Sequence, residues 1–158
     1  MVLASARNLA AGVGRILVVV RPDSHALRRC LAGADIEWVI CNRAEEGMGA
    51  SLACGVAATR EADGWVVALA DMPYIRPATI RSVARALAQG AALAAPFLGG
   101  RRGHPVGFAA PLRDALLALS GDQGGREIVS ANLNRLQHID CDDPGILADV
   151  DLPADLDR

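Results

Sequence analysis

The stretch Trp65-Val66-Val67-Ala68-Leu69-Ala70-Asp71-Met72-Pro73 indicates how the chain folds. A short apolar run with β-branched residues is typical of a strand buried on both faces, as in a parallel sheet. Pro73 lacks the N–H needed for a ladder and favours an extended backbone before it, so we expect the strand to end here. Asp71 would then lie at the carboxyl end of a buried strand, where open α/β sheets bind ligands. Its carboxylate is either a metal ligand or general base, or the cap of the next turn.

Strands and helices alternate on both sides of this stretch, which favours a three-layer α/β domain with a mostly parallel sheet. The 158 residues fit one domain, 1–158. Apolar runs predict further strands at 16–20, 36–41, 92–97, 104–108 and 137–141. Helical spacing and capping residues predict helices at 3–12, 24–33, 50–62, 77–87, 111–119 and 125–136.

Composition excludes several classes of function. The net charge of −2 provides no basic footprint for nucleic acid. All 16 basic residues are arginine, so mechanisms that use a lysine Schiff base or a lysine phosphate clamp are excluded. No apolar run approaches the length of a membrane span, and the N-terminal residues lack a signal-peptide core. We therefore expect a soluble, cytoplasmic protein without a membrane partner.

The cysteines are Cys30, Cys41, Cys54 and Cys141, and no two form a Cys-x-x-Cys motif. Buried reduced thiols are favoured over a metal knuckle or disulfides.

Glycines mark the start of one predicted helix, in Glu46-Gly47-Met48-Gly49-Ala50-Ser51-Leu52, with Gly55 one turn later. Two glycines at a helix start could expose backbone N–H groups to an anion or a base edge, and Ser51 could donate to the same ligand. A flexible helix start that needs no ligand explains the same pattern.

Two further loops carry polar groups that could act on a substrate. In Arg102-Gly103-His104-Pro105-Val106 the histidine lies between a glycine and a proline, where it could contact a phosphate or act as acid or base. A structural histidine is the alternative. In Gly121-Asp122-Gln123-Gly124-Gly125-Arg126, Asp122 could supply a second carboxylate for a divalent ion. Asp151 is better explained as the cap of a last helix near Pro153, whereas the role of Asp149 is open.

In order along the chain, GMGASL with Gly55, LADMP, RGHPV, GDQGGR and DVDLPADL resemble the MobA-like nucleotidyltransferase family. The resemblance extends from about Ile16 to Leu156 and is closest to the branch that transfers a nucleotide to molybdenum cofactor. It implies a Rossmann-like three-layer fold of the nucleotide-diphospho-sugar transferase type. It also implies that a cofactor phosphate attacks the α-phosphate of CTP or GTP and that pyrophosphate is released.

By the same resemblance, Asp71 and His104 would be the catalytic residues, and Asp71 and Asp122 would hold Mg²⁺. Gly47, Ser51 and Gly55 would bind the nucleotide. Arg102, Gly103, His104 and Asp122 would face the molybdopterin-type acceptor. Such a transfer depends mainly on positioning and charge neutralisation. A molybdoenzyme partner and an oligomer are both compatible with this interpretation.

The chain departs from the family at its beginning. Members open with a strand, a glycine-rich signature close to LAAGxSxRMG and then a lysine. Leu9-Ala10-Ala11-Gly12-Val13-Gly14-Arg15 looks similar, but it directly precedes the 16–20 strand and has no lysine after it. We expect it to be the end of a helix, and the domain to be N-terminally truncated without its first, central strand. In Rossmann-like order the gap falls between the 16–20 and 65–70 strands.

Three hypotheses follow from these patterns. The first is an active nucleotidyltransferase, and the second is a truncated relative that binds a nucleotide or assists a molybdoenzyme. In the third, the chain is an α/β interaction domain in which Asp71 and the glycines only shape turns.

Overall fold

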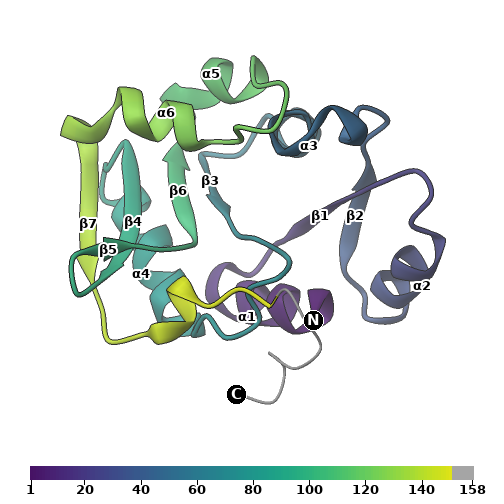
Figure 1. Ribbon diagram of the computed structural model, residues 1–158, viewed down its shortest axis with the longest axis horizontal. Coiled ribbons are helices and arrows are strands. Elements are labelled where there is room, and N and C mark those ends of the chain that lie inside the picture. The colour runs from purple at the N-terminus through teal and green to yellow at the C-terminus, as the bar shows by residue number, and fades with distance from the viewer. Residues whose placement is uncertain (151–158) are drawn as a thin grey trace.

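The computed structural model describes residues 1–150, and strands alternate with helices along them (Figure 1). The helices are α1 (Val2–Val13), α2 (His25–Gly33), α3 (Met48–Ala58), α4 (Pro77–Ala88), α5 (Arg113–Leu117) and α6 (Arg126–Ala131). The strands are β1 (Leu17–Val20), β2 (Glu37–Ile40), β3 (Gly64–Val67), β4 (Leu93–Leu98), β5 (Arg101–Arg102), β6 (Val106–Ala109) and β7 (Leu136–Asp140). Every element predicted within this range is present with shifted ends, and the helix predicted near Pro153 lies outside it.

The described strands form two sheets. β1 and β2 are parallel neighbours, while β3, β6, β4 and β5 follow one another in a second sheet, where β7 pairs parallel with β4. The α/β class is therefore confirmed, but the pairings differ in part from the expected mostly parallel sheet. β6 runs antiparallel between β3 and β4, and β5 folds back on β4. Gly99 and Gly100, at φ of 57° and 79°, form that tight turn, because glycine adopts positive φ without steric cost.

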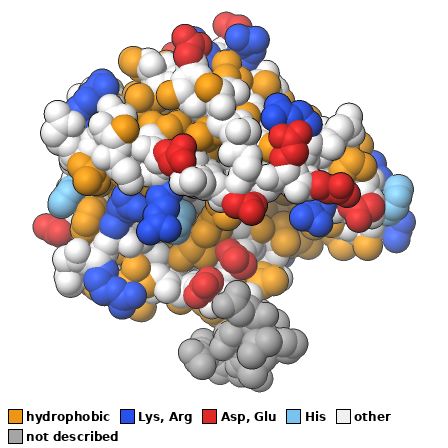
Figure 2. Space-filling view, turned by 45° about the horizontal axis from the view of Figure 1, so that its top comes forward, with side chains coloured by type: hydrophobic (Ala, Val, Ile, Leu, Met, Phe, Trp, Pro, Cys, Tyr) orange, Lys and Arg blue, Asp and Glu red, His pale blue; other side chains and the backbone are white. Residues whose placement is uncertain are grey.

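Among the described residues, β1 pairs only with β2, and β3 pairs only with β6, so each of the two strands has one edge without a partner strand. The sheet is therefore interrupted between β1 and β3, where the sequence analysis expected a gap. All four residues of β3 are only partly buried, as are Leu17, Val18 and Val19 of β1. The expectation that the 65–70 strand is buried on both faces is thus wrong, because β3 has an open edge. Figure 2 shows hydrophobic side chains reaching the surface in a hollow at the middle of one face, with acidic side chains at its rim.

β3 also ends earlier than the sequence predicts. Its last residue, Val67, pairs with Val106 of β6, and Pro105, which precedes Val106, has no N–H to extend the ladder. The chain therefore leaves the sheet four residues before Asp71, which lies in a turn. The proline that ends the strand is on its neighbour and not in the strand's own sequence.

Helices cover the two faces of the larger sheet and complete the three layers (Figure 1). On one face, α3, α5 and α6 pack over β4 and β6, with Val56, Phe97, Phe108 and Leu116 in the main core. On the other face, α4 lies against β3, β4 and β6, and α1 packs on α4. No helix within residues 1–150 is long and apolar enough to cross a bilayer.

The LAAG-like stretch forms the end of α1, as expected, and its last two residues, Gly14 and Arg15, follow the helix. Gly12 packs directly against Ile80 of α4. The absence of a side chain at Gly12 therefore allows α1 and α4 to lie close together.

Candidate functional site

The Asp71 turn is held from two sides. On one side α1 supplies two side chains: the Ser5 hydroxyl donates to the Ala70 carbonyl at 2.9 Å, and the Asn8 amide donates to the Pro73 carbonyl at 2.8 Å. On the other side, the Val150 N–H donates to the Asp71 carbonyl at 2.9 Å. The Asp71 carboxylate itself keeps a buried oxygen, Oδ1, with no hydrogen-bond partner among the described residues. A buried oxygen without a partner is costly unless a ligand or ion completes it.

His104 lies close enough to Asp71 for the carboxylate to influence its charge. Burial lowers the pKa of His104, and the nearby Arg102 charge lowers it further, while Asp71 acts in the opposite direction. His104 Nδ1 is buried and, within residues 1–150, also lacks a partner. The structure therefore brings Asp71, His104 and Arg102 into one group and leaves two polar atoms in it available.

Residues 143–150, of which sequence reasoning noted only the end at Asp149, join the two loops of this group. The Ile146 carbonyl accepts from the His104 N–H at 3.0 Å, while Val150 binds the Asp71 turn as described above. Gly103 packs directly on Ile146, so a side chain at Gly103 would displace this segment. Gly103 thus supports the loop by packing.

Asp143 anchors this segment, and only 1% of its surface is exposed. Its carboxylate accepts from the Arg76 N–H at 2.8 Å, the Thr79 hydroxyl at 2.7 Å and the Gly145 N–H at 3.0 Å. These bonds attach the segment to the first turn of α4. The signal in the sequence is Asp143-Pro144-Gly145, because an aspartate before Pro-Gly commonly accepts from the backbone two residues on.

A second group of predicted residues lines a cavity of about 360 Å³ between β1, α3 and the loop before α6. Gly47 and Ser51 lie together there, and Asp122, which the resemblance assigned to the acceptor and the metal, lies with them, with Arg21 beside them. Gly55 does not line the cavity, because it packs toward Val19 and lets α3 approach β1. Sequence reasoning missed Arg21, although its position directly after a strand, like that expected for Asp71, was a usable signal.

The glycines at the start of α3 contact the loop at residues 121–122, whereas the sequence motif predicted that they would face a ligand. Gly47 has φ of 123°, and a side chain there would collide with Asp122. The Gly49 N–H donates to the Gly121 carbonyl at 2.7 Å, and the Ser51 hydroxyl donates to the Gly47 carbonyl at 3.3 Å. The expectation that both glycines expose N–H groups to a ligand is therefore wrong for Gly49.

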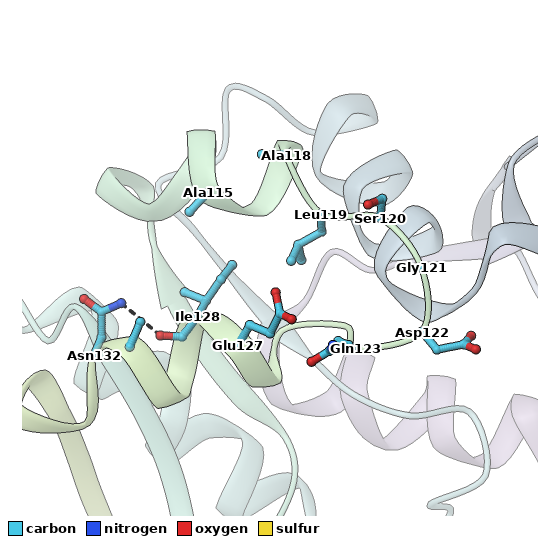
Figure 3. A pocket seen from close by; sticks show the side chains of 11 residues that line it. Ala115, Ala118, Leu119, Ser120, Gly121, Asp122, Gln123, Glu127, Ile128 and Asn132 are labelled. Atoms are coloured by element: carbon cyan, nitrogen blue, oxygen red, sulfur yellow. Dashed lines mark hydrogen bonds between the residues drawn. The ribbon is translucent and has the colours of Figure 1, made fainter.

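A larger cavity of about 590 Å³ lies between α5, α6 and the loop that joins them (Figure 3). Asp122 lines both cavities, so they adjoin at this residue. Glu127, Gln123 and Asn132 also line the larger cavity, and the Asn132 amide donates to the Ile128 carbonyl at 2.9 Å. Because no arginine or histidine lines it, this cavity is poorly suited to a triphosphate.

The two carboxylates predicted to share a metal lie in different groups. Within residues 1–150 no hydrogen bond or ion pair joins Asp71 and Asp122, and Asp71 lines neither of the two cavities. These residues also contain no group of three or more histidine, cysteine, aspartate or glutamate side chains that could hold a metal. A divalent ion here would need ligands from a substrate, as is usual where phosphates complete a magnesium site.

This fold, with acidic and glycine-bearing loops beside its strands, is that of a nucleotidyltransferase-like protein. The MobA-like NTP transferase domain matches residues 1–139, and the chain belongs to this family. None of the curated proteins compared with it matches at the sequence level.

Several solved structures are similar to the chain. Rv0371c from Mycobacterium tuberculosis is 26% identical with a TM-score of 0.74, over 100% of this chain and 83% of that one. The same protein in complex with manganese has a TM-score of 0.76 at 25% identity, over 100% and 85%. A nucleotidyl transferase from Methanothermobacter has a TM-score of 0.79 at 24% identity, over 98% and 76%. Molybdopterin-guanine dinucleotide biosynthesis protein A from Archaeoglobus fulgidus is 18% identical, with a TM-score of 0.57 over 90% and 75%. The last two likenesses show the fold alone.

Proposed function

We propose that this protein transfers CMP or GMP from CTP or GTP to the phosphate of a molybdopterin-type cofactor and releases pyrophosphate. The observation that carries the proposal is the pair of buried, unpartnered atoms Asp71 Oδ1 and His104 Nδ1 in one group. Such atoms are stable in a native structure when a ligand completes their bonding, and they are common at functional sites. Membership of the MobA-like family supplies the reaction type.

The cavity at Gly47 would bind the nucleotide. Arg21 is the charged donor there and would pair with a phosphate, since the chain has no lysine for that role. Ser51 and Asp122 line the same cavity and would contact the sugar, the base or a bound ion. Gly55 would contribute only by allowing α3 to lie close to β1.

The Asp71 carboxylate suits a hard cation, because its buried Oδ1 has no protein partner within residues 1–150. Asp71 would therefore hold Mg²⁺, and Asp122 would reach the ion through the nucleotide. When bound, Mg²⁺ would neutralise charge on the transferred phosphate. The manganese complex of Rv0371c supports a divalent ion for that protein, and we extend this to the present chain.

The acceptor would face Arg102 and His104. Because burial lowers the pKa of His104, the ring is neutral at pH 7 and Nδ1 or Nε2 can accept a hydrogen bond or a proton. Arg102 would attract the acceptor phosphate. We place the reaction in the cytoplasm, with a molybdoenzyme as the protein that would receive the finished cofactor.

The direct test is pyrophosphate release from CTP and from GTP in the presence of Mg²⁺ and molybdopterin. Asp71→Asn should abolish release, and Arg21→Gln should weaken nucleotide affinity at least tenfold. Asp63→Asn and Arg29→Gln are matched controls, because both side chains are exposed and lie outside the two groups. Absence of release with either nucleotide would refute the activity.

The unpaired edges of β1 and β3 favour one alternative: a nucleotide-binding or molybdoenzyme-maturation partner that has lost catalysis. Calorimetric titration with CTP and GTP separates it from the transferase. Mg²⁺-dependent micromolar binding together with turnover excludes the alternative, and binding without turnover supports it.

A further inference from the structure

Two cysteines far from the Asp71 group face each other where β2 ends and α3 begins. Cys41 directly follows β2 and is 2% exposed, while Cys54 lies in the second turn of α3 and is partly exposed. The Cys41 thiol donates to the Ala50 carbonyl at 3.7 Å, on α3, and the Cys54 thiol donates to the Ile40 carbonyl at 3.8 Å, on β2. Each thiol thus bonds to the other's element, so both sulfur atoms occupy the same interface.

The thiols also contact each other, and this contact affects their chemistry. Burial and, to a lesser extent, the interaction with the Cys41 thiol together raise the pKa of Cys54 to about 11, against a weaker opposing effect of Arg43. Cys54 is therefore a thiol at neutral pH. Neither thiol lines the two cavities, so the proposed transfer gives them no role.

We propose that Cys41 and Cys54 form an oxidisable dithiol that closes to an intramolecular disulfide in the presence of a peroxide. One thiol is oxidised by hydrogen peroxide to a sulfenic acid with release of one water. The second thiol attacks that sulfur and releases a second water. In total, two thiols lose two electrons and two protons, and the peroxide is reduced to two molecules of water. Cys54 reacts first, because it is the more exposed of the two.

The disulfide would close a loop over residues 42–53, which contains Gly47, Met48 and Ser51 of the smaller cavity. Joining the end of β2 to the second turn of α3 would restrict how far this cavity can open. The effect on nucleotide binding rests on the proposed function, whereas formation of the disulfide does not.

The test uses the full chain treated with hydrogen peroxide, then alkylated, digested and examined by mass spectrometry. We expect a cross-linked peptide pair containing Cys41 and Cys54, reversed by dithiothreitol. Cys30 and Cys141 should be recovered individually, as neither thiol contacts another within residues 1–150. Cys30→Ser is the matched control and should leave the cross-link unchanged, whereas Cys54→Ser should abolish it. Recovery of Cys41 and Cys54 as separately alkylated or overoxidised peptides would overturn the inference.

A second measurement compares CTP affinity before and after oxidation. We expect at least a threefold change in Kd that dithiothreitol reverses and that Cys54→Ser does not show. If the cross-link forms but CTP binds in neither state, the proposed function fails and the dithiol stands. If no cross-link forms, the inference fails whatever the affinity for CTP.

Discussion

Replacing Asp143 with alanine should loosen the site without touching a residue proposed to contact substrate. The carboxylate is 1% exposed and accepts hydrogen bonds from Arg76, Thr79 and Gly145 at 2.7 to 3.0 Å. Asp143→Ala leaves these three donors without an acceptor and removes the attachment of the 143–150 segment to α4. Because this segment holds both the Asp71 turn and His104, we expect both to become more mobile in Asp143→Ala.

The magnitude follows from these contacts. A buried donor that loses its partner costs about 1–3 kcal/mol, and loss of a helix cap costs about 1 kcal/mol. Since the three donors share one acceptor, their costs are not independent, and we expect the free energy of unfolding to fall by about 3–5 kcal/mol. That is a large part of the total free energy of unfolding of a small domain, which is about 5–15 kcal/mol.

Urea unfolding followed by circular dichroism measures this loss. Asp142→Ala is the matched control, because the neighbouring carboxylate is 96% exposed and makes only a surface ion pair with Arg76 at 3.2 Å. Such a pair contributes about 0–1 kcal/mol. Hydrogen exchange at the His104 and Val150 amides should also accelerate in Asp143→Ala. Equal losses for the two alanine variants would show that the buried carboxylate does not anchor the segment.

Three further predictions concern separate parts of the molecule. Gly47→Ala should cost about 2 kcal/mol in urea unfolding, because alanine is strained at φ of 123° and its Cβ would meet Asp122; an unchanged midpoint would contradict this geometry. The lowered pKa of His104, from 6.5, means that the folded chain binds fewer protons than the unfolded chain just below pH 6.5. Stability should therefore fall as the pH drops below 6.5, and His104→Gln should reduce that fall; an equal fall in both chains would refute the assignment. With a pKa of about 11, Cys54 should react with iodoacetamide about ten times faster per pH unit from pH 7 to 9, and a rate that levels off in this range would argue against the raised pKa.

Local patterns were sufficient for most of the secondary structure. The periodicity around Ile80 predicts α4, and Pro77 marks its first turn, because these signals depend on neighbours within one helical turn. The LAAG-like stretch was assigned to the end of a helix because it directly precedes the 16–20 strand and no lysine follows it. An interruption between the 16–20 and 65–70 strands was also expected from the order of motifs, and within residues 1–150 β1 and β3 belong to separate sheets.

Contacts between distant segments were beyond the sequence. The end of β3 is set by Pro105 on another strand, so the apolar run alone predicts a strand three residues too long. Asp143 and the segment after it hold the Asp71 turn from more than 70 residues away, and no periodicity reports such a contact.

The sequence alone therefore determined the α/β class, the family resemblance and the loops that carry Asp71, His104 and Asp122. The tertiary structure decided which of them meet: Asp71 with His104, and Asp122 with Gly47 and Arg21. It also decided that Cys41 and Cys54 face each other. The physical reason is that residue type and spacing fix hydrogen bonding and burial within an element, whereas these pairs depend on how separate elements pack.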